Sequence, residues 1–312
     1  MDEVQLNGQP FSILTLDGGG SRGAFTLGAL AEIEAQLGKK LSVHFELMYG
    51  TSTGAIIATY LATGYTAKQT FERYMEFIPR VMSCRTTNGR TAALEDVAKE
   101  EFGECEFSDA RCMLAIVATR TDHRRPLIFK SNAELAQGRK ATFVPGFGVP
   151  LHECLLASSA AAPFFEKRKL TIDDVEVEVI DGGFVANNPS MFALIDAERA
   201  LSIKRQDIRL CAIGTGDFPV KKHWWDFAKS VWPIQLLEAT LESNSNTVEI
   251  LRKLTFEDVS TVRVNGVYRD TSLATDLLES DPKMLRKLFE LGREAFGTQE
   301  QALAKLFGVN HG

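Results

Sequence analysis

Twice near its start, the chain runs from a short apolar segment through a glycine-rich turn into a helical pattern. The apolar segments are Phe11–Leu16 and Phe45–Tyr49, and the helical patterns that follow them are Ala24–Leu37 and Ala55–Ala62. A repeated order of strand, tight turn and helix predicts parallel strands connected by helices that pack on the sheet. We therefore expect an α/β fold, a three-layer α/β/α sandwich with a mostly parallel central sheet.

The remainder of the chain extends this plan. Further strand patterns occur at Met113–Thr119, Pro126–Lys130, Val175–Ile180 and Leu210–Ile213. The segment Thr66–Phe107 is helical and charged, and we expect it to form a lid or a side layer. From about Trp224 onward the pattern is mostly helical. We predict an α/β core at residues 1–217 and a helical C-terminal part at residues 218–312 that packs on the same domain.

Composition excludes several classes of protein. The 312 residues carry 35 Lys and Arg against 41 Asp and Glu, a formal net charge of −6, so a partner that is a nucleic-acid polymer is not expected. Five cysteines without regular spacing argue against a disulfide framework and suit a reducing cytosol. The first ten residues do not resemble a signal peptide, and no apolar stretch reaches the ~20 residues of a membrane helix. We therefore expect a cytoplasmic protein.

The second glycine turn, Gly50–Gly54, reads G-x-S-x-G with Ser52 at its centre. Between a strand and a helix, this pattern is typical of a nucleophile elbow, in which small neighbours let the serine Oγ project at the sheet edge. The alternative interpretation is an ordinary turn whose Ser or Thr caps the helix.

The first glycine turn, Asp17–Gly23, contains three consecutive glycines. Such a loop brings backbone N–H groups close to an anion, which is either a phosphate or the oxyanion of an acyl-transfer intermediate. A dinucleotide site also needs an acidic residue at the end of the next strand, but Tyr49–Ser52 occupies that place. A phosphate-binding P-loop needs Lys followed by Ser or Thr, where this chain has Ala24 and Phe25.

A carboxylate ends another strand pattern, because Asp181 follows Val175–Ile180 and precedes Gly182 and Gly183. Asp is common in turns for structural reasons alone, but a serine nucleophile needs a base to accept its proton. None of the five histidines lies in a strand-end motif: His44, His123, His152, His223 and His311. The residues therefore favour a Ser52–Asp181 pair over a Ser–His–Asp triad.

Together these motifs resemble those of the patatin-like phospholipase family, in which a D-G-G-G-x-R-G loop, a G-x-S-x-G turn and a D-G-G/A turn occur in that order. Ser158–Pro163 matches a further A-S-x-A-A-P segment, with Ser in place of the first Ala, and Gly214–Gly216 matches a G-T-G strand end. The resemblance covers roughly residues 11–217. It implies that residues 1–217 form a patatin-like catalytic core, a serine acyl hydrolase that cleaves fatty-acyl esters of membrane phospholipids.

The resemblance also implies a role for each motif residue. Ser52 is implied as the nucleophile and Asp181 as its base, without a metal or a cofactor. The amides of the oxyanion hole are those of Gly18, Gly19 and Gly20. The supporting motif residues are Arg22, Gly23, Gly50, Gly54, Gly182 and Gly183. The substrate is then the surface of a phospholipid bilayer, which a cytoplasmic enzyme reaches by peripheral contact with the inner membrane.

Basic residues gather in the middle of the chain despite its negative net charge: Arg120, Arg124, Arg125, Arg139 and Lys140. Arginine binds phosphate in a bidentate way, so this group is a candidate anion or nucleotide site, although such runs are usually solvated surface. Patatin-like proteins of similar layout include bacterial anti-phage effectors that a cyclic oligonucleotide switches on. From this resemblance we expect a cyclic-oligonucleotide activator.

An aromatic cluster with neighbouring lysines begins the C-terminal part: Phe218, Trp224, Trp225, Phe227 and Trp232, with Lys221, Lys222 and Lys229. It is either a patch that meets a bilayer, or core, or a homodimer contact. Three alternative functions remain: a constitutive lipid acyl hydrolase, a dinucleotide-binding oxidoreductase, and a catalytically silent binding protein.

Overall fold

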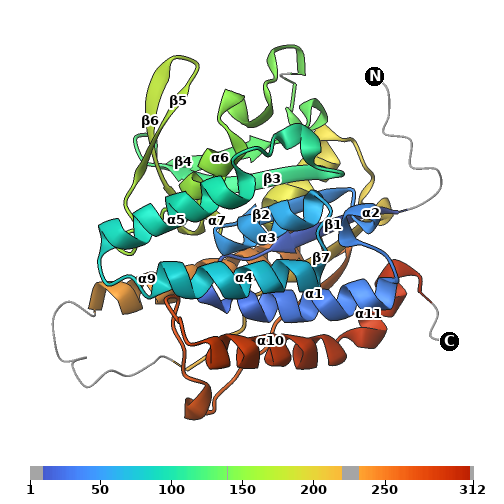
Figure 1. Ribbon diagram of the computed structural model, residues 1–312. Coiled ribbons are helices and arrows are strands. Elements are labelled where there is room, and N and C mark those ends of the chain that lie inside the picture. The colour runs from blue at the N-terminus through green and yellow to red at the C-terminus, as the bar shows by residue number, and fades with distance from the viewer. Residues whose placement is uncertain (1–9, 139, 220–231, 310–312) are drawn as a thin grey trace.

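The structure, a computed structural model, describes residues 10–138, 140–219 and 232–309 (Figure 1). Its sheet has the strand order β5-β6-β3-β2-β1-β7-β8, with β4 also paired to β3. The strands are β1 (Phe11–Leu16), β2 (Leu47–Thr51), β3 (Met113–Arg120), β4 (Arg125–Lys130), β5 (Arg168–Ile172), β6 (Val175–Asp181), β7 (Ile208–Ile213) and β8 (Ser260–Val264). Neighbours from β3 to β8 along this order are parallel, whereas β4, β5 and β6 pair antiparallel. The prediction of a mostly parallel α/β sheet is confirmed.

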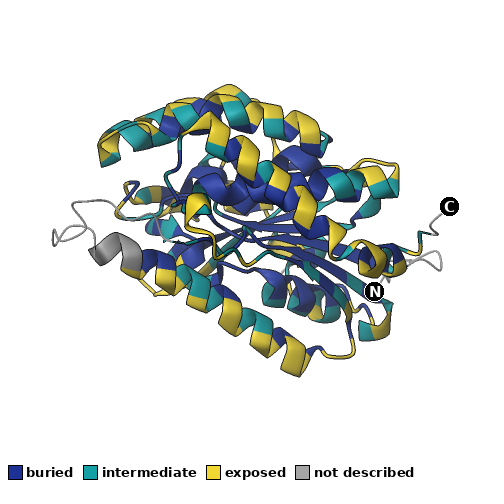
Figure 2. Cartoon of the chain, turned by 90° about the horizontal axis from the view of Figure 1, so that it is seen from below, coloured by how far each residue is buried: buried dark blue, intermediate teal, exposed yellow. Residues whose placement is uncertain are grey.

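Side chains alternate between the two faces of the sheet along each strand. Both faces carry buried apolar side chains, and helices cover both of them. Leu14 and Met48 belong to one core, and Ile13 and Tyr49 to the other. The first core is covered by α1 (Gly23–Leu37), α3 (Thr53–Ala62), α6 (Leu151–Ser158) and α10 (Pro282–Gly297). The second is covered by α7 (Gly183–Ala186) and α8 (Ser190–Ile195), on which α9 (Trp232–Thr255) packs. Figure 2 shows the buried residues between these layers.

The middle region forms two helices, α4 (Ala67–Met82) and α5 (Thr87–Phe102), which lie side by side at the front of Figure 1. Thr66 begins α4 with a capping box that also uses Gln69. Phe77 and Val81 on α4 are buried towards the first core. The region is therefore a side layer, one of the two arrangements expected from the sequence.

The described residues of the C-terminal part are mostly helical, but β8 adds a strand to the sheet. Helix α10 packs directly on α1, and both helices have a glycine at the contact. A Cβ on Gly28 would lie 1.9 Å from the Phe289 oxygen, and one on Gly292 would lie 1.9 Å from the Phe25 oxygen. The two backbones therefore touch, which fixes the C-terminal part to the core. The short helices α2 (Leu41–His44) and α11 (Glu300–Phe307) complete this side.

The features expected to meet a bilayer are only partly described. Phe218 is buried and stacks on Tyr268 with ring centroids 4.8 Å apart, so this member of the aromatic cluster is core. Trp224, Trp225 and Phe227, with the three lysines, lie outside the described residues, as does the side chain of Trp232. The bilayer patch and the homodimer contact stay predictions. None of the described helices is long and apolar enough to cross a membrane.

Candidate active site

Ser52 lies at the carboxyl end of β2, directly before α3. Its φ of 54° and ψ of −125° form a strained conformation that non-glycine residues rarely adopt. The flanking glycines make the turn sterically possible. A Cβ on Gly50 would lie 2.4 Å from the Gly54 oxygen, and one on Gly54 would lie 2.3 Å from the Leu16 oxygen. This is the geometry of a nucleophile elbow.

Asp181 reaches Ser52 although its strand, β6, runs antiparallel to β3. Strand β4 fills one edge of β3, so β2 and β6 share the other edge. Thr51 pairs with Val117, and Asp181 pairs with the next residue, Ala118. The carboxyl ends of β2 and β6 therefore meet head to head, which places the carboxylate beside the nucleophile elbow.

The Asp181 carboxylate is buried, and this burial raises its pKa from 3.8 to about 6. Hydrogen bonds from the Ser52 hydroxyl and from the Gly183 N–H, which lies 2.7 Å from Oδ1, oppose the shift. These hydrogen bonds offset part of the desolvation cost, but the charged form remains less stable than that of an exposed aspartate. A carboxylate whose pKa lies near the working pH is suited to general base catalysis.

Ser158 connects the elbow to its neighbours. Its hydroxyl accepts a hydrogen bond from the Ser52 N–H at 2.8 Å and donates to a β3 carbonyl oxygen at 2.6 Å. The Gly182 N–H donates to the backbone carbonyl oxygen of Ser158 at 3.2 Å, and the Asp181 N–H donates to that of Ala160 at 3.0 Å. This small-residue segment therefore positions both members of the pair. In the sequence, the segment Ser158–Pro163 is indicated only by the family resemblance, which gives it no role.

The glycine loop after β1 presents two free N–H groups to the same space. The Gly18 N–H donates to the Asn187 oxygen at 3.0 Å, which removes this amide from the three-amide hole expected from the sequence. Within the described parts of the chain, the N–H groups of Gly19 and Gly20 have no acceptor. Both glycines line a pocket with Ser52. Gly19 and Gly20 are therefore the donors that fit an oxyanion hole.

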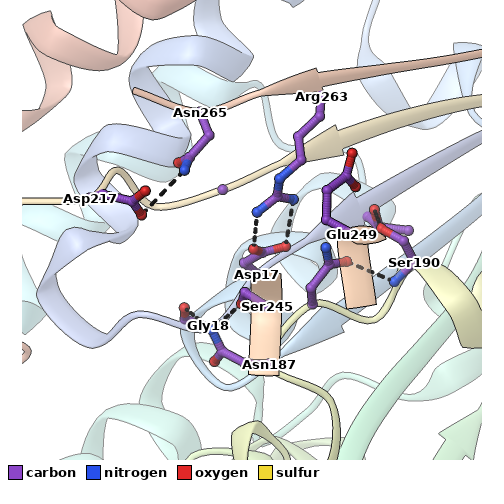
Figure 3. A network of polar contacts seen from close by, with 12 residues as sticks. Asp17, Gly18, Asn187, Ser190, Asp217, Ser245, Glu249, Arg263 and Asn265 are labelled. Carbon is purple, nitrogen blue, oxygen red and sulfur yellow. Dashed lines mark hydrogen bonds and ion pairs between the residues drawn. The ribbon is translucent and has the colours of Figure 1, made fainter. Parts of the chain in front are cut away.

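Two buried residues of this loop, Asp17 and Arg22, form ion pairs with residues of the C-terminal part. Asp17 accepts hydrogen bonds from Arg263 of β8 at 2.6 and 3.3 Å (Figure 3). Arg22, the motif arginine, is buried and pairs with Glu238 and Glu242 of α9 at 3.7 and 3.3 Å. Arg22 thus supports the loop. No local pattern in the sequence indicates Arg263, because its partner Asp17 lies 246 positions away.

An apolar pocket opens beside Ser52 and is walled by α3, α4, α5 and the segment after α6. Its apolar lining includes Ile56, Phe77, Val81, Leu94, Phe164 and Phe165. A smaller cavity shares Ile56, Phe77 and Leu94 with this pocket and is also lined by Val97, Ala98 and Phe102. The pocket and this smaller cavity, both walled by the side layer, are together called the apolar channel. From helical periodicity alone, the residues that line these cavities cannot be told apart from ordinary core residues.

No histidine among the described residues lines this pocket. His44 lies between Phe45 and Phe307, where burial lowers its pKa to about 4. His123 and His152 lie next to Asp122 and Glu153, at 3.8 Å in each case. His223 and His311 lie outside the described residues. The carboxylate of Asp181 is the base that the described pocket offers.

The structure does not gather the basic residues of the middle segment at one place. Arg120 makes a two-pronged contact with Asp122 at 2.7 and 2.8 Å, and Arg124 and Arg125 are exposed at the same end of the β3–β4 hairpin. Lys140 pairs with Glu134, near the other end of β4, a strand that spans about 17 Å from Arg125 to Lys130. Arg139 lies outside the described residues. The hairpin separates the two groups because its strands are extended.

Comparisons with known proteins identify the family. The protein-family model described as patatin-like phospholipase matches residues 14–194. A cUMP-AMP-activated phospholipase of Escherichia coli is 46% identical over 294 residues, which cover 93% of this chain and 92% of that protein. A cGAMP-activated phospholipase of Escherichia coli strain TW11681 is 28% identical, with coverage of 83% and 80%. The crystal structure of VipD from Legionella pneumophila aligns with a TM-score of 0.48 and 12% identity, over 96% of this chain and 69% of that chain.

The fold and the site define an ester-hydrolysing enzyme of the α/β class. The chain belongs to the patatin-like phospholipase family, as its motifs indicated. This membership sets aside the alternative of a dinucleotide-binding oxidoreductase.

Proposed function

We propose that this enzyme hydrolyses fatty-acyl esters of membrane phospholipids with Ser52 as nucleophile and Asp181 as base. The observation that carries the proposal is the meeting of three features at one place. A strained serine, a buried carboxylate with a raised pKa, and two free N–H groups lie at the mouth of an apolar channel. Each feature alone has structural explanations, but together they supply the parts of acyl transfer.

The reaction proceeds in two steps. Ser52 Oγ attacks the ester carbonyl carbon and gives its proton to the Asp181 carboxylate, while the N–H groups of Gly19 and Gly20 stabilise the oxyanion. The leaving alcohol takes the proton from Asp181, which produces an acyl-enzyme and the lysophospholipid. Water then gives a proton to Asp181 and attacks the acyl carbonyl, and the returning proton releases Ser52 and the fatty acid.

The raised pKa of Asp181 leads to an expected pH profile. The base must be ionised, so kcat/KM should rise with pH through a midpoint near 6 and level off above it. The measurement is hydrolysis of a soluble short-chain ester between pH 4.5 and 8. Since an ordinary histidine titrates near ~6.5, His152→Gln serves as the control and should leave the midpoint unchanged. A midpoint near ~4, or one that disappears in His152→Gln, would remove Asp181 from this role.

The channel predicts which residue limits the length of the acyl chain. Ala98 is buried and lines the smaller cavity but not the pocket beside Ser52, so Ala98→Phe should fill the smaller cavity. We expect kcat/KM for a C16 ester to fall by about 10- to 200-fold, in line with the cost of misfit in apolar pockets, while a C4 ester is hydrolysed as before. Ala92 lies exposed on the same helix, and Ala92→Phe should change neither. An equal loss for both esters would place the acyl chain elsewhere.

We further propose that a cyclic dinucleotide activates the enzyme, which then acts on the inner membrane from the cytoplasmic side. Support comes from the 46% identical relative that is named for activation by cUMP-AMP. The test is lipid mass spectrometry after incubation with phospholipid vesicles, with and without cUMP-AMP and cGAMP. Release of fatty acid that needs a nucleotide is the expected result. Equal activity without nucleotide favours the constitutive hydrolase, and no activity or fluorophosphonate labelling under any condition favours the silent binding protein.

A further inference from the structure

A second cavity lies away from Ser52, between β4, the loop that follows it and α8. It shares no lining residue with the pocket beside Ser52. Its walls are mostly apolar: Ile128, Phe143, Val144, Phe147, Phe192 and Ile195. Val144 and Phe147 keep 54% and 42% of their surface exposed. Large apolar side chains that are exposed around a hollow are typical of a ligand site.

The floor of this cavity is polar and centres on Asp196, which is only 2% exposed. Its carboxylate accepts hydrogen bonds from the Tyr49 hydroxyl and from Gln137 Nε2, and it pairs with Lys130 Nζ at 2.6 Å. Lys130 also donates to the Leu135 oxygen at 2.9 Å, so these contacts use two of its three protons. A mostly apolar cavity with a few converging polar groups suits a small molecule that has both a flat apolar body and polar edges.

The backbone around the cavity is strained, which is an observation independent of its composition. Gln137 and Phe147 have left-handed φ values of 43° and 59° although neither is a glycine. Helix α8 continues into a π-helical turn, Asp196–Ala200, that begins at the central carboxylate. Both kinds of distortion concentrate at functional sites and ligand clamps.

The cavity is also connected to the nucleophile. Tyr49 is fully buried in β2, and this strand leads directly into Ser52. Because the Tyr49 hydroxyl donates to Asp196, one carboxylate is shared by the cavity floor and the strand that carries the elbow. A ligand that binds Lys130 or Gln137 would compete with the Asp196 carboxylate for these partners. If the elbow has two arrangements and the ligand binds one of them better, binding shifts the population towards that arrangement.

We propose that this cavity binds the activating nucleotide, an inference that rests on the proposed activation by a cyclic dinucleotide. A planar base fits against the aromatic walls, and its amino and imide N–H groups match the acceptor oxygens of Asp196 and Gln137. A phosphate matches Lys130. A fatty acid would also fit the apolar walls, but it has no N–H groups to donate to the acceptor oxygens of Asp196 and Gln137.

Two variants of the full-length protein test the site directly. Phe143→Ala removes part of an aromatic wall, and Val144→Glu crowds the rim with a negative charge that repels the phosphates of the ligand. Each should weaken cUMP-AMP binding, measured by isothermal titration calorimetry, by about tenfold. The concentration that gives half-maximal vesicle hydrolysis should rise equally, while basal hydrolysis of a soluble short-chain ester stays unchanged. Val43→Glu is the matched control, because Val43 is exposed on α2 and does not line this cavity.

A third variant tests the connection to Ser52. Tyr49→Phe keeps the ring but deletes the donor, so cUMP-AMP should still bind while the maximal activation falls. If the wild type is activated but Phe143→Ala and Val144→Glu bind as well as Val43→Glu, the site is elsewhere and the proposed activation stands. If the wild type neither binds nor responds to cUMP-AMP or cGAMP, the proposed activation fails and this inference fails with it. Binding of oleate that Val144→Glu blocks, without nucleotide binding, would make the cavity a fatty-acid site instead.

Discussion

Asp181→Asn should abolish phospholipid hydrolysis and at the same time stabilise the fold at pH 7. The amide cannot accept the Ser52 proton, and loss of such a group elsewhere costs roughly 10³–10⁶ in rate. Burial raises the pKa of Asp181 from 3.8 to about 6. Stability is therefore greatest when this group is protonated and falls as the pH rises from about 4 to about 6, by on the order of 3 kcal/mol. Asparagine is neutral at every pH and does not incur this cost.

The two effects are measured together, as the rate on phospholipid vesicles and as the melting temperature at pH 5 and pH 7. Asp174→Asn is the matched control, because Asp174 is exposed at the β5–β6 turn with a φ of 61° that asparagine tolerates. It should change neither quantity. Ser52→Ala should lose activity to the same degree, since the two groups act as a unit. An Asp181→Asn enzyme with near-normal turnover would show that another group is the base.

The parts of the site that could be predicted from the sequence are those that a local turn determines. The elbow at Ser52 and the loop at Gly18–Gly20 each need glycines at fixed positions, because an added Cβ would meet backbone or a fixed side chain. Strand, turn and helix follow one another within a few residues there. Local patterns therefore indicated both features and the parallel strands β1 and β2.

The parts that could not be predicted depend on pairing across long stretches of chain. Strand β5 is short, partly exposed and rich in charge, and β8 follows a long helix, so neither has a clear strand pattern. The head-to-head meeting of β2 and β6 follows from how three strands share β3. Two further contacts also depend on pairing across long stretches of chain. They are the hydrogen bond from the Gly18 N–H to the Asn187 carbonyl oxygen and the ion pair between Asp17 and Arg263. These contacts exist only once the sheet has formed.

Gly19→Ala is expected to lower kcat by roughly 10²–10³ with little change in KM, the cost of losing an oxyanion donor. Gly19 has a φ of 176°, which any residue adopts, so the damage must come from contact. A Cβ at this position would lie 2.6 Å from side-chain atoms of Thr215. The loop has to move, and the N–H groups of Gly19 and Gly20 move with it. Ester turnover at saturating substrate, with KM from the same titration, measures the effect.

Two further variants decide whether this reason is correct. Gly297→Ala places a methyl group where nothing lies within 4 Å, so it should leave both constants unchanged. Thr215→Gly removes the side chain that the new methyl group meets, so the double variant Gly19→Ala/Thr215→Gly should regain part of the lost kcat. Without this rescue, the displacement of the loop by Thr215 is not the cause. An unchanged kcat with a poorer KM in Gly19→Ala would mean that the loop binds a ground-state ligand, because an oxyanion donor acts only on the charge that develops in the transition state.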